Sequence, residues 1–209
     1  MVTMSKTTTN QIKSRKRVAE HGEVFTAKRE VNAMLDLVKE ETDRIDSRFL
    51  EPACGNGNFL VEILSRKLEA VEKQKHMWHR DRVAEKMADL SLLAVSNIYG
   101  FDIMQDNVEE SRARMLTILC EWYEKATTGL YPLRENYGRM KAPQYLINGW
   151  EYILKHNIQR GDFLKMQHPE TGQPLMVRQW EINGKTVNFT FHMLSDLIDT
   201  NKPKQLMLW

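Results

Sequence analysis

Cysteine is scarce in this chain, and the features typical of exported and membrane proteins are missing from it. The 209 residues include two cysteines, Cys54 and Cys120, which lie far apart and lack the spacing of metal ligands. A disulfide framework or a zinc site is therefore not expected. No apolar run approaches the roughly 18 residues that span a bilayer, and the first residues lack the apolar centre of a signal peptide. We expect a cytoplasmic protein that contacts no membrane and binds no metal.

The chain also lacks a large excess of charge of either sign. A formal net charge of +2 excludes a polycation of the kind that coats nucleic acid. The imbalance is local, because no acidic residue occurs between Met1 and Ala19, where five basic residues lie: Lys6, Lys13, Arg15, Lys16 and Arg17. We expect residues 1–18 to form a basic, disordered tail, and the alternative is an arm that meets phosphates or an acidic partner.

Helical and strand patterns alternate from residue 28 onward. Apolar residues at helical spacing predict helices over residues 28–41, 59–73, 83–94, 108–123 and 150–155. Short buried strands are predicted at residues 48–52, 97–103 and 157–163, and a loop at residues 127–141. Strands that alternate with helices indicate βαβ units, so the predicted class is α/β with a mainly parallel sheet and flanking helices.

The C-terminal part, residues 166–209, has a different pattern. Residues 176–191 carry Asn183-Gly184 in their middle, a pair typical of two-residue hairpin turns. Such a turn would place Trp180 opposite Val187 and gather large apolar side chains on one face: Trp180, Ile182, Val187, Phe189 and Phe191. We expect a C-terminal β-hairpin and extension that pack on the rest of the chain or on a partner.

The stretch EPACGNGNFL, residues 51–60, predicts a sharp turn between the first strand and its helix. Gly55 and Gly57 can adopt backbone angles closed to other residues, and they leave room for a ligand near the first amides of the helix. A dinucleotide fingerprint would need a third glycine where Leu60 stands, and no Gly-Lys-Ser/Thr of a P-loop occurs. A tight connection without a ligand is the alternative interpretation.

Two segments of the chain suggest a family. HGEVFTAKREVNAMLDLV (residues 21–38) and FLEPACGNGNFLVEIL (residues 49–64) resemble the S-adenosylmethionine-binding half of the adenine-specific (N6) DNA methyltransferases of restriction-modification type. In that family a Gly-x-x-Phe-Thr-Pro segment precedes an acidic-Pro-Ala-Cys-Gly-x-Gly-x-Phe turn, and Ala27 here replaces the usual proline. The resemblance implies a truncated, Rossmann-like class I methyltransferase fold, with a cofactor-binding domain over residues 19–165.

The resemblance also implies which residues near the turn bind S-adenosyl-L-methionine. Phe25 and Thr26 would contact the amino acid end of the cofactor and the surroundings of its adenine. The residues that would line the methionine moiety are Glu51, Ala53, Gly55 and Gly57. The turn amides and the Glu51 carboxylate would meet the zwitterion.

The ends of the second and third predicted strands would hold the nucleoside part. Asp102 matches the family's acceptor for the ribose hydroxyls, a role that suits a carboxylate because it can accept two hydrogen bonds. Ile103 would cover the adenine ring. Asp162 would accept from the adenine amino group, with Phe163 stacking nearby.

The family's catalytic loop is missing from this sequence. Holding a flipped base needs polar acceptors and aromatic faces, which the family supplies with an Asn-Pro-Pro-Tyr-like loop, whereas no two prolines are adjacent here. The catalytic residues are therefore unknown. One hypothesis is a subunit or compact variant that methylates DNA adenine, with a partner supplying the catalytic loop and target-recognition domain. A second is a non-catalytic S-adenosylmethionine-binding regulator or methyltransferase partner, encoded by a phage or mobile element. The third is another methyl acceptor or a degenerate fragment.

Overall fold

The computed structural model describes residues 13–21, 24–128, 141–184 and 186–198 of the chain. The helices in these ranges are α1 (Arg15–His21), α2 (Lys28–Asp36), α3 (Lys39–Thr42), α4 (Asn58–Lys73), α5 (Val83–Ser96), α6 (Gln105–Thr127), α7 (Gln144–Asn157) and α8 (Leu194–Leu197). The strands are β1 (Phe49–Glu51), β2 (Ile98–Asp102), β3 (Ile158–Arg160), β4 (Met176–Asn183) and β5 (Thr186–Met193). Short 3₁₀ helices occur at Lys75–Met77 and Arg80–Arg82. No described helix has both the length and the apolarity needed to cross a membrane.

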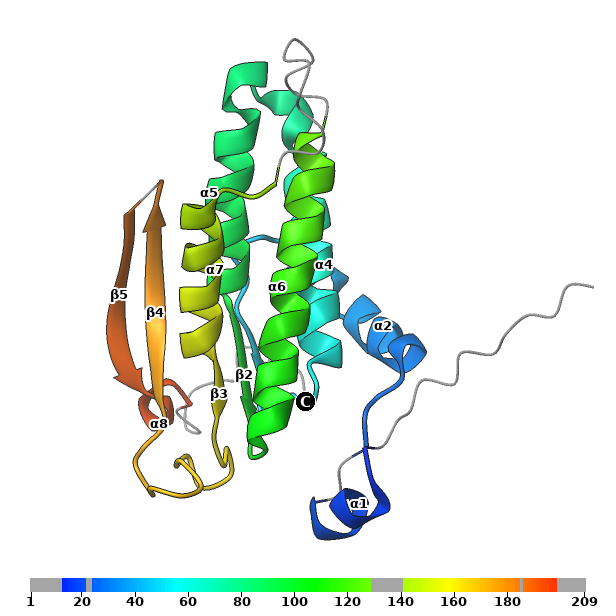
Figure 1. Ribbon diagram of the computed structural model, residues 1–209, viewed down its shortest axis with the longest axis vertical. Coiled ribbons are helices and arrows are strands. Elements are labelled where there is room, and N and C mark those ends of the chain that lie inside the picture. Colours follow the sequence, from blue (N-terminus) through cyan, green and yellow to red (C-terminus); the bar gives the residue numbers. More distant parts are fainter. Residues whose placement is uncertain (1–12, 22–23, 129–140, 185, 199–209) are drawn as a thin grey trace, which may run out of the picture.

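Strands β1, β2 and β3 form a parallel sheet with β2 in the middle (Figure 1). Phe49 lies opposite Ile98 where β1 meets β2, and Gly100 lies opposite Ile158 where β2 meets β3. Helices α4 and α5 connect β1 to β2, and α6 and α7 connect β2 to β3. The predicted α/β class, with a parallel sheet and flanking helices, is therefore confirmed.

Helices α4, α5, α6 and α7 pack together and extend beyond the short strands (Figure 1). The apolar stripe predicted for α4 is buried throughout: Leu60, Ile63, Leu64, Leu68 and Val71. Trp150 of α7 is fully buried, and its indole N–H donates to the Ser91 hydroxyl at 3.0 Å. The helices come close enough that a Cβ on Gly149 would lie 3.1 Å from Leu92. This tight packing places the main core on one side of the sheet.

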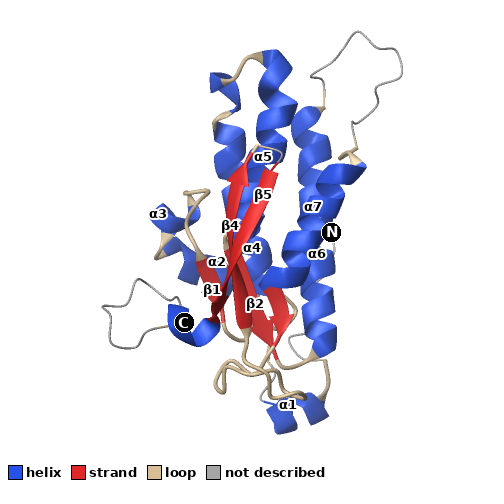
Figure 2. Cartoon of the chain, turned by 90° about the vertical axis from the view of Figure 1, so that its left-hand side faces the viewer, coloured by secondary structure: helices blue, strands red, loops and turns tan. Residues whose placement is uncertain are grey.

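The C-terminal segment covers the other side of the sheet. Phe101 of β2 is buried there in a second apolar cluster with Leu175, Val177 and Leu194. Figure 2 shows one end of the β4–β5 hairpin in front of the sheet and the rest of it in front of the helices. The Tyr99 hydroxyl donates to the Arg178 carbonyl at 2.8 Å and ties the two layers together. The start of the hairpin and α8 therefore belong to the core.

The predicted register of the hairpin is wrong by two residues, because the turn begins one residue later than predicted. Trp180 lies opposite Phe189, and Ile182 lies opposite Val187. The reason is that Asn183 continues the strand and pairs with Thr186, so the turn follows at Gly184, whose φ of +57° suits glycine. The change keeps every side chain on its predicted face, because the pairing shifts by two residues and side chains alternate between faces with a period of two. Trp180 and Ile182 pack against the main core as expected.

Several predicted helices have other bounds in the structure. The helix predicted over residues 28–41 is split, because Val38 has a non-helical backbone between α2 and α3. Helix α7 begins well before the predicted residue 150, and α6 extends beyond both predicted ends. Most of the loop predicted at residues 127–141 lies outside the described residues. The helix and strand types are otherwise those that the sequence predicts.

A buried lysine fastens the segment before β1 to α4. The Lys67 ammonium donates to the carbonyls of Arg44, Ile45 and Ser47 at 3.0, 2.9 and 2.6 Å. Burial lowers the pKa of Lys67 to about 7, but three carbonyl acceptors match the three N–H donors of the charged form. The ammonium also lies 5.2 Å from the centre of the Phe49 ring. This lysine therefore positions the chain as it enters β1.

We predict that Lys67→Met lowers the free energy of unfolding by about 3 kcal/mol, because three buried carbonyls lose their donor. Urea denaturation followed by circular dichroism measures the change. Lys73→Met, on the same helix but with a largely exposed side chain, is the matched control. A Lys67→Met variant as stable as the control would contradict this role.

Candidate functional site

The glycine turn after β1 is held by its own backbone and by α6. Cys54 N–H donates to the Phe101 carbonyl, and Gly57 N–H donates to the Cys54 carbonyl, both at 2.8 Å. Gly55 and Gly57 have φ values of +53° and +86°, in the left-handed region that favours glycine. The predicted strand, glycine turn and helix are therefore present, and the turn lies at the carboxyl end of β1.

Side chains of the chain itself lie beside both glycines. A Cβ on Gly57 would lie 2.8 Å from the Ser111 hydroxyl, and a Cβ on Gly55 would lie 3.1 Å from the Phe25 ring. The space that we expected the glycines to leave for a ligand is thus used for packing at these two points. This packing does not involve the backbone N–H groups of Asn56 or of the first turn of α4, which are the remaining donors of the turn.

Asp102 joins the turn to the end of β2. Its Oδ2 accepts from Gly55 N–H at 2.9 Å, and its Oδ1 accepts from Met104 N–H at 2.8 Å and from the Asn107 side chain at 3.2 Å. A carboxylate oxygen can accept two hydrogen bonds. Oδ2 therefore keeps capacity for one more donor, such as a ribose hydroxyl.

Glu51, at the end of β1, is a carboxyl group with no basic partner among the described residues. Burial raises its pKa to about 7, and a hydrogen bond from the Ala53 backbone lowers the pKa by a smaller amount. No described basic side chain forms an ion pair with Glu51. Ala53 itself is exposed beside it. The site thus holds a carboxyl group that would gain from a positively charged ligand.

The segment before α2, for which the resemblance implies cofactor contacts, packs on the turn. Phe25 is buried against Gly55, and the Thr26 carbonyl accepts from the Asn58 side chain at 2.9 Å. Ile103 follows Asp102 and remains 38% exposed, so its apolar surface is available. Phe25, Thr26, Glu51 and Ile103 therefore gather around the carboxyl ends of β1 and β2.

The two residues predicted at the end of β3 have other contacts. The Asp162 carboxylate accepts from Lys165 N–H at 3.1 Å and pairs with the Lys165 ammonium at 3.2 Å. The first of these bonds is the main reason that the pKa of Asp162 is lowered. The Phe163 ring lies 6.0 Å from Phe101, in the second apolar cluster. Both side chains are therefore engaged within the chain.

A polar stripe on α6, which was not among the predicted site residues, supports the turn. The Ser111 hydroxyl donates to the Gly55 carbonyl at 2.9 Å, and Arg114 donates to the Asn56 carbonyl and to the Asn58 side chain. Together with Asn107 these residues are spaced by four and three, so they share one face of the helix. That spacing, next to an apolar stripe, was the available signal.

Part of the predicted basic tail binds to α6. Lys13 pairs with Asp106 and Glu110 at 3.1 and 2.7 Å, and Arg17 makes two hydrogen bonds to Asp106. These cations hold the pKa of Asp106 well below its usual range. Helix α1 (Arg15–His21) begins within residues 1–18, which were predicted to be disordered, because acidic side chains of the same chain pair with Lys13 and Arg17. Residues 1–12 lie outside the described part.

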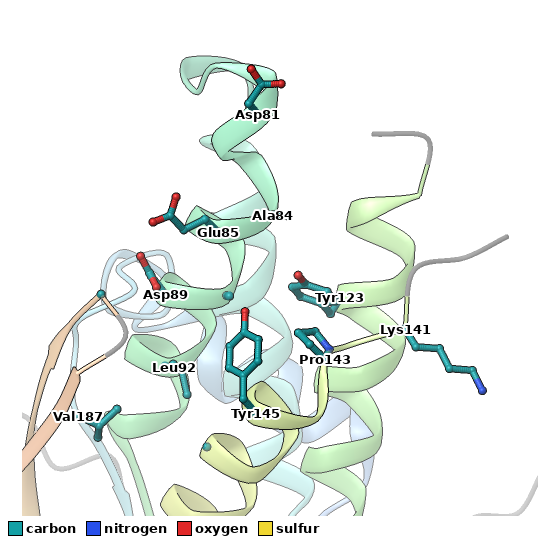
Figure 3. Close-up of a pocket in the computed structure, with 13 residues that line it drawn as sticks. Asp81, Ala84, Glu85, Asp89, Leu92, Tyr123, Lys141, Pro143, Tyr145 and Val187 are labelled. Carbon is teal, nitrogen blue, oxygen red and sulfur yellow. The ribbon is translucent and has the colours of Figure 1, made fainter. Parts of the chain in front are cut away.

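A separate cavity of about 880 Å³ lies near the opposite ends of the strands, between α5, the start of α7 and the hairpin (Figure 3). None of the residues predicted for the cofactor lines it. Its acids Asp81 and Glu85 are paired with His79 and Arg82 at 3.4 and 2.6 Å. Among the described residues, no three His, Cys, Asp or Glu side chains are grouped so as to hold a metal ion.

Comparisons with models of protein families, with curated proteins and with solved structures find no match to this chain. Its function is therefore argued from the geometry of the site and from the motifs in the sequence.

We predict that Glu51 makes stability depend on pH. Its pKa rises from 4.5 to about 7 on folding, so the folded protein holds a proton that the unfolded chain releases. The free energy of unfolding should be largest below pH 4.5, fall as the pH approaches 7, and level off above it. Urea denaturation across this range measures the slope. Glu51→Gln should remove it, whereas the exposed Glu40→Gln should not; a slope that survives in Glu51→Gln would contradict the assignment.

We predict that Asp106→Asn releases α1 from α6, because Arg17 and Lys13 lose a charged acceptor. Hydrogen exchange of the α1 amides should quicken by about fivefold, equivalent to about 1 kcal/mol, and high salt should quicken it in the wild type. Glu109→Gln, whose partner Gln105 lies within α6, is the control. Unchanged exchange in Asp106→Asn would show that these ion pairs do not hold α1.

Proposed function

We propose that this chain binds S-adenosyl-L-methionine at the carboxyl ends of β1 and β2, as a protein related to the N6-adenine DNA methyltransferases. The observation that carries the proposal is the Glu51 carboxyl group, which is partly buried, has its pKa raised to about 7 by that burial, and forms no ion pair with a described basic side chain. The ammonium group of an amino acid ligand would supply that cation. The bound cofactor would supply an electrophilic methyl group on a sulfonium.

The neighbouring residues fit the other parts of this ligand. The free acceptor capacity of Asp102 Oδ2 suits a ribose hydroxyl, and the exposed surface of Ile103 suits an adenine ring. The Asn56 side-chain oxygen is buried without a donor in the described chain, so a polar ligand group beside the turn would satisfy it. The contacts of Phe25 and Ser111 keep the turn in one conformation.

The sheet order supports a Rossmann-like arrangement. The order β1-β2-β3 corresponds to one half of a doubly wound sheet, in which ligands bind at the carboxyl end of the first strand. In the complete arrangement a further strand would lie on the free side of β1. A partner chain that carries the catalytic loop and a target-recognition domain would then allow action on DNA adenine.

One observation favours the second candidate, a non-catalytic S-adenosylmethionine-binding regulator or partner of a methyltransferase. Asp162 is bound by Lys165, and Phe163 packs against Phe101. Both groups expected to meet the adenine are therefore directed to other contacts. A protein that binds the cofactor without using it would tolerate this arrangement.

Isothermal titration calorimetry with S-adenosyl-L-methionine tests the proposed site. We predict that the wild type binds, and that Glu51→Gln and Asp102→Asn each weaken binding by at least about tenfold, since each removes a charged acceptor. Adenosine lacks the ammonium group, so Glu51→Gln should leave its affinity unchanged, whereas Asp102→Asn should still weaken its binding. Glu40→Gln is the control.

A wild type that shows no heat of binding would overturn the proposed function. Tritiated methyl transfer to unmethylated DNA then separates the two candidates. Transfer by the chain, alone or with a purified methyltransferase subunit, supports the catalytic candidate. Binding without transfer in either case supports the regulator.

A further inference from the structure

Strand β5 forms one edge of the hairpin. It pairs with β4 through eight residue pairs without a bulge, from Met176 opposite Met193 to Asn183 opposite Thr186. No described strand pairs with its outer side. In an antiparallel pair, every second residue directs its N–H and C=O away from the neighbouring strand. β5 therefore presents a row of backbone donors and acceptors on its free side.

This edge lacks the devices that keep strand edges apart. Natural edges are usually blocked by charged side chains, proline, bulges or short length. The sequence of β5, TVNFTFHM, contains no lysine, arginine, aspartate, glutamate or proline. Its register is regular over its full length. A strand of this kind is a template for pairing with another strand.

The two faces of β5 differ in a regular way. One face is apolar: Val187, Phe189, Phe191 and Met193. The other face is polar: Thr186, Asn188, Thr190 and His192. Phe191 and Met193 are 57% and 46% exposed. The Arg178 guanidinium lies 4.5 Å from the Phe189 ring and 5.0 Å from the Phe191 ring, so the apolar face is held in place.

We propose that β5 pairs with β5 of a second copy of this chain, antiparallel, about a twofold axis at Thr190. The backbone donors and acceptors of two such strands face each other only when odd-numbered residues lie opposite odd-numbered ones. The apolar residues of β5 are the odd-numbered ones, so this pairing also sets the apolar faces side by side. Placing the axis at Thr190 sets Phe189 opposite Phe191 and Val187 opposite Met193 of the other copy. An axis midway between two residues would pair apolar with polar faces, and an axis at Phe189 would leave Met193 without a partner within β5.

A second copy fits this edge because the edge is complementary to itself. The edge carries no lysine, arginine or carboxylate, so two copies meet without repulsion between such charges. Twofold pairing also covers the β5 edge of both copies, so the association stops at a dimer. Nucleic acid is disfavoured, because its binding requires several cations along a surface. The dimer does not rest on the proposed cofactor site, and it is tested without cofactor.

Disulfide trapping tests the register in a Cys120→Ser background, where the remaining Cys54 is buried. Thr190→Cys places two thiols directly opposite each other across the axis, at a Cα separation that a disulfide spans. Mild oxidation should convert most of this variant to a covalent dimer. Gln179→Cys is the control, because Gln179 lies beside Thr190 on β4, one strand away from the axis.

Sedimentation velocity over a concentration series tests the association itself. The wild type should sediment as a dimer at the higher concentrations. Thr190→Lys should raise the dissociation constant of the dimer by at least about tenfold, because two ammonium groups would meet at the axis. Gln179→Lys should leave this constant unchanged. A monomeric wild type, or equal behaviour of the Thr190 and Gln179 variants in either experiment, would overturn the proposal.

Discussion

The site depends on the hydrogen bonds of one carboxylate, that of Asp102. It accepts from Gly55 in the glycine turn, from Met104 after β2 and from Asn107 on α6. The glycine turn, 47 residues earlier in the sequence, is thereby fixed to the end of β2 and the start of α6. Hydrogen bonds to a charged acceptor are each stronger than neutral ones. Glu51 and Phe25 take their positions relative to this turn, so the geometry of the whole site follows from Asp102.

Ionisation of the Glu51 carboxyl group is energetically unfavourable in the folded protein. A pKa shift from 4.5 to about 7 means that the ionised carboxylate is less favourable in the folded protein by about 3 kcal/mol. No described basic side chain pairs with Glu51, whereas Lys67, a buried amine whose pKa is also shifted, is surrounded by three carbonyls. Lys67 thus has partners within the chain, whereas Glu51 has no described cation, which is the basis of the proposal that it meets a ligand. This difference is the reason for assigning binding, and not only folding, to this end of the sheet.

Local signals predicted much of this architecture, and long-range contacts decided the rest. The turn at Gly55 and Gly57 and the helix after it were predictable, because glycines and an apolar stripe specify them within a few residues. The start of α7 was missed because Asn148 and Gly149 weaken the helical pattern, although Gly149 permits close contact with Leu92. The order in α1 depends on Arg17 meeting Asp106, which is 89 residues away. The engagement of Asp162 by Lys165 also left no distinct signal in the sequence.

The central claim is that Glu51, a partly buried carboxyl group with no described cation beside it, meets the positive charge of a ligand. The most direct test follows the side-chain carbon of this glutamate by ¹³C nuclear magnetic resonance while the pH is varied, with and without S-adenosyl-L-methionine. The account predicts a midpoint near pH 7 in the free protein and a clear fall when the cofactor is present, because its ammonium group favours the carboxylate. A midpoint at the ordinary value for glutamate, unchanged by the cofactor, would contradict it.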